Sequence, residues 1–151
     1  MLKKVLIANR GEIAVRIEQT LKAMGIGSVA VFSDADRTAL HVRNAGEAYP
    51  LQGTVPADTY LNLGRLLAIA RESGCDALHP GYGFLSESPR LSEACREAGL
   101  VFIGPSPEAM RLVGNKAAAK QLATSVNVPT VPGALLEAVR SGNQIGTRIV
   151  K

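Results

Sequence analysis

The chain opens with a short apolar run followed by a longer run of helical periodicity. Residues 5–8 are apolar with β-branched members and too few for a helix, so they predict a strand buried on both faces. Four apolar residues then recur at the spacing of one helical face: Ile13, Ile17, Leu21 and Met24. Gly25 follows, where a left-handed residue commonly ends a helix. This order predicts the opening of a parallel α/β sheet.

The same alternation continues to about residue 105. Further strands are predicted at residues 28–32, 47–51, 75–79 and 101–103. Helices are predicted at residues 38–44, from a cap at Asp58 or Thr59 to Ser73, and from Ser88-Pro89 to Ala98. Gly74 and Gly99, like Gly25, end a helix just before a strand. The fold class is therefore α/β, a Rossmann-like doubly wound parallel sheet.

The first turn, residues 9–12 (NRGE), lacks the glycines of a dinucleotide-binding loop. Glu12 would stand at the positive end of the helix, where a phosphate would otherwise bind. An ordinary strand–helix turn is the simpler interpretation, and NAD binding is disfavoured. Asp34 and Asp36, after the second strand, are interpreted as turn and helix-cap residues rather than ribose ligands.

A second loop, residues 81–88 (GYGFLSES), follows the fourth strand directly. Two glycines flank an aromatic residue at the carboxyl edge of the predicted sheet, which is where open α/β sheets bind ligands. A purely structural turn is the alternative.

The last third of the chain differs in composition. Helices are predicted at residues 107–113, 115–126 and 135–140, with a proline-bearing linker at residues 127–133 and a strand beginning at Ile149. We therefore expect one domain at residues 1–113, and at residues 114–151 linker helices with the truncated start of a second domain.

Composition narrows the function classes. The chain has 151 residues, 46% hydrophobic, with a net charge of +4 that is scattered along it, and only 4% aromatic residues, so nucleic-acid binding is not expected. No membrane-length apolar run or signal peptide is visible, which predicts a cytoplasmic protein, with an organellar origin as the alternative. Cys75 and Cys95 are expected to be buried free thiols, and two histidines are too few for a zinc site.

Five segments, in this order, resemble one family. They are residues 4–17 (KVLIANRGEIAVRI), 60–62 (YLN), 79–87 (HPGYGFLSE), 102–107 (FIGPSP) and 114–116 (GNK). From about Leu2 to Gly133 the chain resembles the amino-terminal part of biotin carboxylase, the ATP-dependent component of acetyl-CoA, propionyl-CoA, methylcrotonyl-CoA and pyruvate carboxylases. The resemblance implies a Rossmann-like domain preceding an ATP-grasp module. It also implies an activity in which ATP and bicarbonate give carboxyphosphate, whose CO2 passes to biotin on a carrier protein.

The resemblance implies few site residues. Lys116 matches a lysine that contacts ATP, and Lys151 a second one, although residues 146–151 (GTRIVK) lack the family's proline and are one residue shorter. Tyr82 and Gly83 would lie near the biotin pocket. Asn9, Arg10 and Glu12 would fix the sheet edge rather than act on substrate.

The resemblance implies a carrier protein or domain and a carboxyltransferase as partners. A homodimer through the first helix is a further possibility, although its outer face carries Gln19 and Ala23 where the family has charges. The glycine-rich phosphate loop, the Mg²⁺ carboxylates and the bicarbonate-binding arginine and lysine lie further along in the family. No catalytic or metal residue is therefore expected here, and the chain alone is expected to be inactive. The alternative is a non-catalytic scaffold that docks on a full-length carboxylase.

Overall fold

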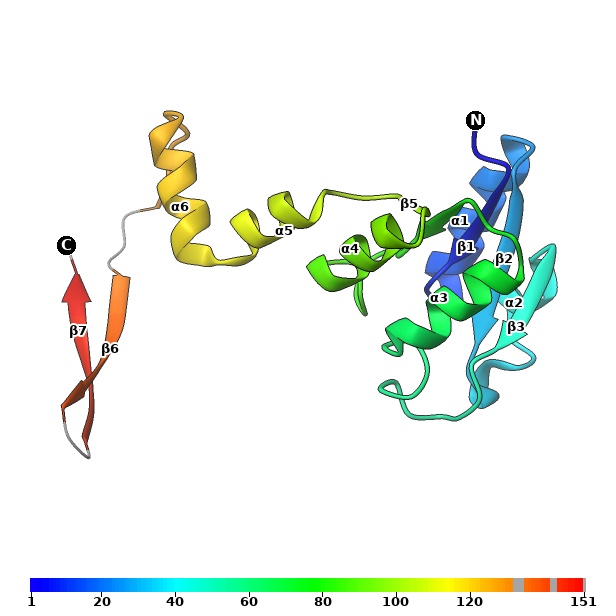
Figure 1. Ribbon diagram of the computed structural model, residues 1–151, viewed down its shortest axis with the longest axis horizontal. Helices are drawn as coiled ribbons and strands as arrows, with labels where there is room; N and C mark the ends of the chain where they lie inside the picture. The colour runs from blue at the N-terminus through cyan, green and yellow to red at the C-terminus, as the bar shows by residue number, and fades with distance from the viewer. Residues whose placement is uncertain (132–134, 142–143, 151) are drawn as a thin grey trace. The chain divides into compact units, whose positions relative to one another are not determined.

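The computed structural model describes residues 1–131, 135–141 and 144–150. The chain divides into two compact units, Met1–Met110 and Arg111–Lys151, whose elements are labelled in Figure 1.

The first unit is built on a five-stranded sheet in the order β3-β2-β1-β4-β5. Its strands are β1 (Lys4–Ile7), β2 (Gly27–Phe32), β3 (Glu47–Pro50), β4 (Ala77–His79) and β5 (Val101–Phe102). Every neighbouring pair is parallel; in the central strand, Val5 pairs with Ser28 on one side and with Ala77 on the other. The doubly wound parallel sheet that the hydrophobic pattern predicts is confirmed.

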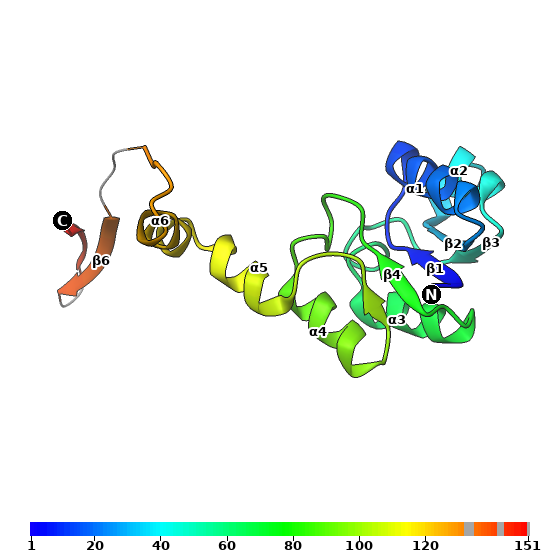
Figure 2. The same cartoon turned by 90° about the horizontal axis from the view of Figure 1, so that it is seen from above.

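Helices cover both faces of this sheet. Figure 2 shows α1 (Gly11–Ala23) and α2 (Leu40–Asn44) on one face, and α3 (Leu63–Glu72) and α4 (Pro89–Glu97) on the other. A short 3₁₀ turn, η1 (Asp34–Asp36), follows β2. Alternate residues of β1 point to opposite faces, so Leu6 belongs to the core under α3 and α4, whereas Val5 belongs to the core under α1.

Helix ends match the sequence in part. Gly25, Gly74 and Gly99 all have positive φ, as the glycine stops predicted. The expected cap at Asp58 or Thr59 is wrong, because α3 starts later and the side chain of Asn62 accepts the hydrogen bond from the backbone N–H of Arg65. Residues 56–61 form turns that the pattern of apolar residues does not distinguish from a first helical turn.

The buried face of α1 also differs from the expected one. Ala14, Glu18 and Leu21 are the buried residues of this helix, whereas Met24 is 64% exposed. Ala14, Glu18 and Leu21 are spaced like a helical face too, and Ala14 and Leu21 pack against Val5, Ile7 and Ala77 of the sheet. A carboxylate is thus buried where the sequence predicts none.

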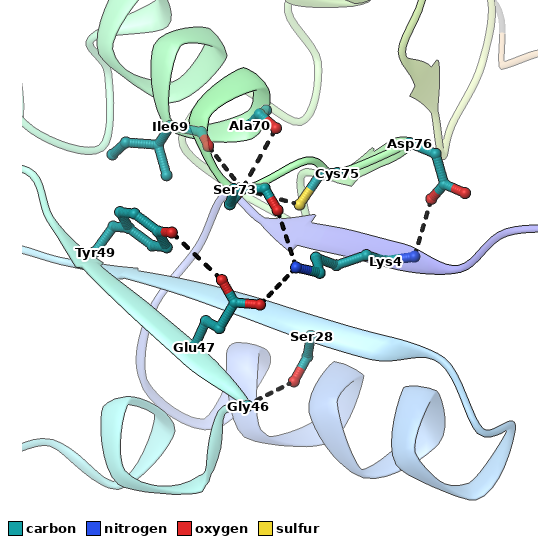
Figure 3. Close-up of polar contacts among 10 residues, drawn as sticks. All are labelled: Lys4, Ser28, Gly46, Glu47, Tyr49, Ile69, Ala70, Ser73, Cys75 and Asp76. Carbon is teal, nitrogen blue, oxygen red and sulfur yellow. Dashed lines mark hydrogen bonds and ion pairs between the residues drawn. The ribbon is translucent and has the colours of Figure 1, made fainter.

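The amino-terminal edge of the sheet is closed by ionic contacts (Figure 3). The ammonium of Lys4 donates to Glu47 on β3 at 2.5 Å and to the carbonyl of Ser73 at 2.9 Å. The carboxylate of Asp76 accepts the backbone N–H of Lys4, at 3.0 Å. These contacts connect the ends of β1, β3 and α3, at the edge opposite the one where ligands bind in such sheets.

The second unit contains a helix and a hairpin. α5 (Pro107–Gly114) crosses the boundary between the two units and is followed by α6 (Lys116–Ser125). An antiparallel hairpin of β6 (Leu135–Ser141) and β7 (Gln144–Val150) comes next. The helix predicted at residues 135–140 is wrong: these residues form a strand, because the hairpin's cross-strand hydrogen bonds override a weak local propensity. None of the helices in the described residues has the length and apolar character that a bilayer crossing requires.

Candidate functional site at the carboxyl edge of the sheet

The sheet order places a topological switch point between β1 and β4. The chain leaves β1 toward β2 on one side, and β4 leads to β5 on the other. In open α/β sheets, ligands bind outside the carboxyl ends of the strands at this point. The residues there follow Ile7 and His79, and they are the two segments that the sequence analysis singled out, residues 9–12 and 81–87.

Asn9 bridges these two segments. Its buried side-chain amide donates to the carbonyl oxygens of Pro80 at 2.8 Å and of Tyr82 at 2.9 Å. Its side-chain oxygen accepts the backbone N–H of Arg10 at 2.9 Å. The amide is therefore fully used within the chain, and it fixes the start of the second loop against the first.

Gly81 allows this close approach. A Cβ atom at Gly81 would lie 2.7 Å from the amide nitrogen of Asn9 and 2.7 Å from a methyl group of Ile13. Its φ of +66° is also one that only glycine adopts without strain. Glycine at position 81 thus leaves room for the Asn9 amide and also adopts the positive φ that this turn has.

Arg10, the residue after Asn9, forms an ion pair with Asp36. Its Nε donates to Asp36 at 2.7 Å, and its Nη2 donates to the other oxygen of the same carboxylate. Tyr60 Oη donates to Asp36 at 2.6 Å and accepts the backbone N–H of Ser33 at 3.0 Å, while the Ser33 hydroxyl also donates to Asp36. The Arg10 guanidinium, helped by these hydroxyls, holds the pKa of Asp36 well below its usual range.

This arrangement bears on the interpretation of the two aspartates. Both oxygens of Asp36 are bound by groups of the chain itself, so Asp36 has none left for a ribose in this conformation. Asp34 accepts the backbone N–H of Gly53, which agrees with a turn role. The helix-cap expectation is wrong, because Ala39 precedes α2 and no side chain caps that helix.

The second loop is also held at its far end. The ring of Phe84 stacks on that of Tyr60, with centroids 5.1 Å apart and an interplanar angle of 22°. The Arg10 guanidinium lies 6.0 Å from the centre of the Tyr60 ring. Tyr60 is only 3% exposed. Burial is the larger cause that raises the pKa of its hydroxyl, and the hydrogen bond to Asp36 raises it further. Arg10 thus contacts both residues that hold the loop, Asn9 at its start and Tyr60 at its far end.

Tyr82 and Gly83 lie at the exposed tip between these two supports. The Tyr82 side chain is 57% exposed and its hydroxyl donates to Glu12 at the start of α1. No atom lies within 4 Å of a Cβ built at Gly83. An aromatic side chain and an open backbone stretch are therefore exposed together at the loop tip.

A shallow apolar hollow of about 510 Å³ adjoins Tyr82. The apolar side chains that line it are Leu2, Ile13, Ile17, Leu21, Met24, Ile26 and Ile103. All four apolar residues predicted as the buried stripe of the first helix line this hollow, and of these only Leu21 is buried. In the part of the chain that the structure describes, no three His, Cys, Asp or Glu side chains are grouped to hold a metal ion.

The lysines predicted to contact ATP belong to the other unit. Lys116 is the first residue of α6 and is exposed, and the Asn115 side chain caps this helix by accepting the N–H groups of Ala117 and Ala118. Lys151 lies outside the described residues. Tyr60 and Phe84 received no role from the sequence, although both lie in segments that carry the resemblance. Their rings stack across 24 residues of sequence, and a local sequence pattern does not reveal such a contact.

Comparison of the sequence with known proteins identifies a family. Residues 1–110 match the model of the family described as biotin carboxylase, N-terminal domain. The chain is 50% identical to the biotin carboxylase of Halalkalibacterium halodurans over 133 residues, which are 88% of this chain and 29% of that protein. It is 52% identical to the urea amidolyase of Saccharomyces cerevisiae over 132 residues, 87% of this chain and 7% of that one.

A solved structure gives the same result. The biotin carboxylase domain of a thermophilic 2-oxoglutarate carboxylase, bound to ADP without magnesium, superposes with a TM-score of 0.85 at 42% identity, covering 99% of this chain and 38% of that one. The chain therefore spans less than two fifths of each of these three relatives. From the family match over residues 1–110, the chain belongs to the biotin carboxylase family and carries its N-terminal domain.

Proposed function

We propose that the chain is the N-terminal segment of an ATP-dependent biotin carboxylase, a ligase that carboxylates biotin on a carrier protein with bicarbonate. The single observation that carries this proposal is the family match over residues 1–110. Within that match, the loop of residues 81–87 lies at the switch-point edge, where a ligand is expected. Biotin would be presented there by a carrier protein or domain, with a carboxyltransferase as the next partner.

The residues present fit part of this machinery. Tyr82 and Gly83, exposed at the loop tip, are the residues we assign to the biotin side. Lys116, and Lys151 by its sequence position, are assigned to the phosphates of ATP; bound MgATP would supply the activated phosphoryl group. Among the described residues, no three His, Cys, Asp or Glu side chains are grouped to hold a metal ion, and we assign no Mg²⁺ ligand to them. We place the boundary between the N-terminal domain and the ATP-grasp segment after residue 113.

The proposal predicts that the chain alone has no carboxylase turnover. Phosphoryl transfer needs positioned metal ions and cationic clamps that the described residues do not assemble. The test has two arms. The purified chain is assayed for biotin-dependent ADP release from ATP and bicarbonate, with Lys116→Ala as the control. A chimera is also assayed, in which this chain's matched segment replaces the corresponding 133 residues of the H. halodurans enzyme.

We expect no turnover above the control in the first arm and biotin carboxylation in the second. Turnover by the chain alone that Lys116→Ala abolishes would refute its inactivity. An inactive but folded chimera would refute the assignment to a catalytic carboxylase.

The second candidate function is a non-catalytic module that docks on a full-length carboxylase. The observation that favours it is the partly exposed apolar hollow beside α1, whose residues Ile17 and Ile103 pack only in part against the core. Size-exclusion chromatography of the chain mixed with a full-length carboxylase tests this function. Co-elution that Ile17→Asp prevents would support it, and separate elution at micromolar concentrations would exclude it.

A further inference from the structure

We propose that Asn9 and Tyr60 are positioning residues that hold the loop of residues 81–87 from the two sides of Gly83, and so set the orientation in which it meets biotin. This inference rests on the function proposed above, which places Tyr82 and Gly83 beside biotin. It concerns two residues that do not themselves form the exposed tip.

The loop needs support because its backbone conformation is unfavourable. Gly81, Gly83 and Phe84 all have positive φ, at +66°, +71° and +42°. Phe84 has a side chain, which the left-handed region disfavours. Gly81 and Gly83 adopt this conformation without strain, whereas Phe84 keeps it only where surrounding contacts fix it.

Asn9 supplies the first of these contacts. Both of its N–H donors are used on the carbonyl groups that flank Gly81, those of Pro80 and Tyr82. The side chain is fully buried, and its oxygen is held by the N–H of Arg10, so the amide has one orientation available. The position of the Tyr82 backbone is therefore determined by a rigid group at the end of β1.

Tyr60 supplies the second contact. Its ring stacks on Phe84, and its hydroxyl is held by Asp36 and by the N–H of Ser33. The ring is thus fixed from behind by a buried ionic network, and it fixes Phe84 in turn.

Arg10 joins the two supports. Its backbone N–H binds Asn9, and its guanidinium binds Asp36, which binds Tyr60. The contacts therefore form a closed ring that runs from the loop through Asn9, Arg10, Asp36 and Tyr60 back to the loop at Phe84. This ring holds the loop on both sides of Gly83, at which a Cβ atom would meet nothing within 4 Å.

The test uses the chimera described above with single substitutions that each remove one of the two supports. Asn9→Asp keeps the acceptor for Arg10 but removes both donors, and Phe84→Leu removes the ring stacking. We expect each to raise the KM for free biotin by about tenfold, while ADP release from ATP and bicarbonate without biotin stays within about twofold. Phe84→Tyr keeps a stacking ring and should retain the original KM. Asn62→Asp, the same change at the cap of α3, is the matched control.

A second measurement follows the loop itself in the 151-residue chain. The backbone N–H of Ser86 donates to the carbonyl of Gly83 at 2.9 Å, so its hydrogen exchange reports the loop conformation. We expect Asn9→Asp to speed this exchange at least about tenfold, with the exchange of the β1 amides unchanged.

The outcomes separate the two proposals. An unsubstituted chimera that does not carboxylate biotin counts against the proposed function. An active chimera whose biotin KM is unaffected by Asn9→Asp and Phe84→Leu refutes the positioning role. Biotin-independent ADP release that falls as much as biotin carboxylation also refutes it, because that pattern indicates general loss of structure. Unchanged exchange at Ser86 refutes the positioning role whatever the chimera does.

Discussion

Glu18 is a buried carboxylate that destabilises the fold above neutral pH. It is 5% exposed, and neither of its side-chain oxygens has a hydrogen-bond partner. Glu18 lines a hollow of about 710 Å³ together with Lys22 and Arg43, but neither basic side chain forms a hydrogen bond with the Glu18 carboxylate. Burial raises the pKa of Glu18 from 4.5 to about 7, because an ionised carboxylate loses its hydration there.

The sign and size of the effect follow from this pKa. Below pH 4.5 the group is protonated in both states and costs nothing as a charge. Between pH 4.5 and 7 the unfolded chain loses this proton while the folded chain keeps it, so stability falls as the pH rises. Each pKa unit corresponds to about 1.4 kcal/mol, so the loss above pH 7 is about 3 kcal/mol.

The substitution Glu18→Gln removes this titration. Urea unfolding followed by circular dichroism, at pH 4.5, 6 and 8, should show the variant gaining about 3 kcal/mol on the wild type between the lowest and the highest pH. Comparing the two pH values cancels the constant cost of burying an unpaired amide. Glu97→Gln, on the exposed surface of α4, is the matched control and should change stability by less than about 0.5 kcal/mol at every pH. Parallel stability curves for Glu18→Gln and the wild type would refute the reasoning.

Three further predictions test the carboxyl edge and the thiols. Gly81→Ala should destabilise the chain by about 2 kcal/mol more than Gly83→Ala in urea unfolding, because only the Gly81 methyl group collides with buried neighbours; equal losses would contradict this. Asp36→Asn should cost at least about 2 kcal/mol at pH 7 and clearly less at pH 2, since the low pKa of Asp36 contributes stability that is lost progressively as the pH falls below the usual range of an aspartate; a pH-independent loss would argue against the ion pair. Cys75 and Cys95 are buried, and burial raises the pKa of Cys95 to about 11, so both should react with a thiol reagent only as fast as the chain opens, and rapid reaction in the native protein would disprove their burial.

Local patterns predicted most of the first unit. Residues 5–8 read as a buried strand because four apolar residues in a row fit a strand covered on both faces, and the structure buries all four. The same holds for the glycine stops, since Gly25 needs only its own backbone geometry to end α1. The position of the loop at residues 81–87 also followed, because a parallel sheet brings all carboxyl ends to one edge.

Contacts between distant segments were not predictable in this way. The bond from Asn9 to Tyr82 joins residues 73 apart, and Arg10 to Asp36 joins residues 26 apart. Neither leaves a periodic signal, because each involves one polar side chain in an irregular turn. The burial of Glu18 was missed for a related reason: the α1 sequence allows two overlapping stripes, and which of them is buried depends on contacts with distant strands.

The two borders of the parallel sheet limit self-association. β3 ends at Pro50, which has no N–H to offer a further strand, and β5 is only two residues long. An added strand would find too few free backbone groups at either border to pair in register. Concentrated solutions of this domain should therefore resist the ladder-like polymerisation that long, bare border strands promote, even though most of the sheet's own residues are apolar.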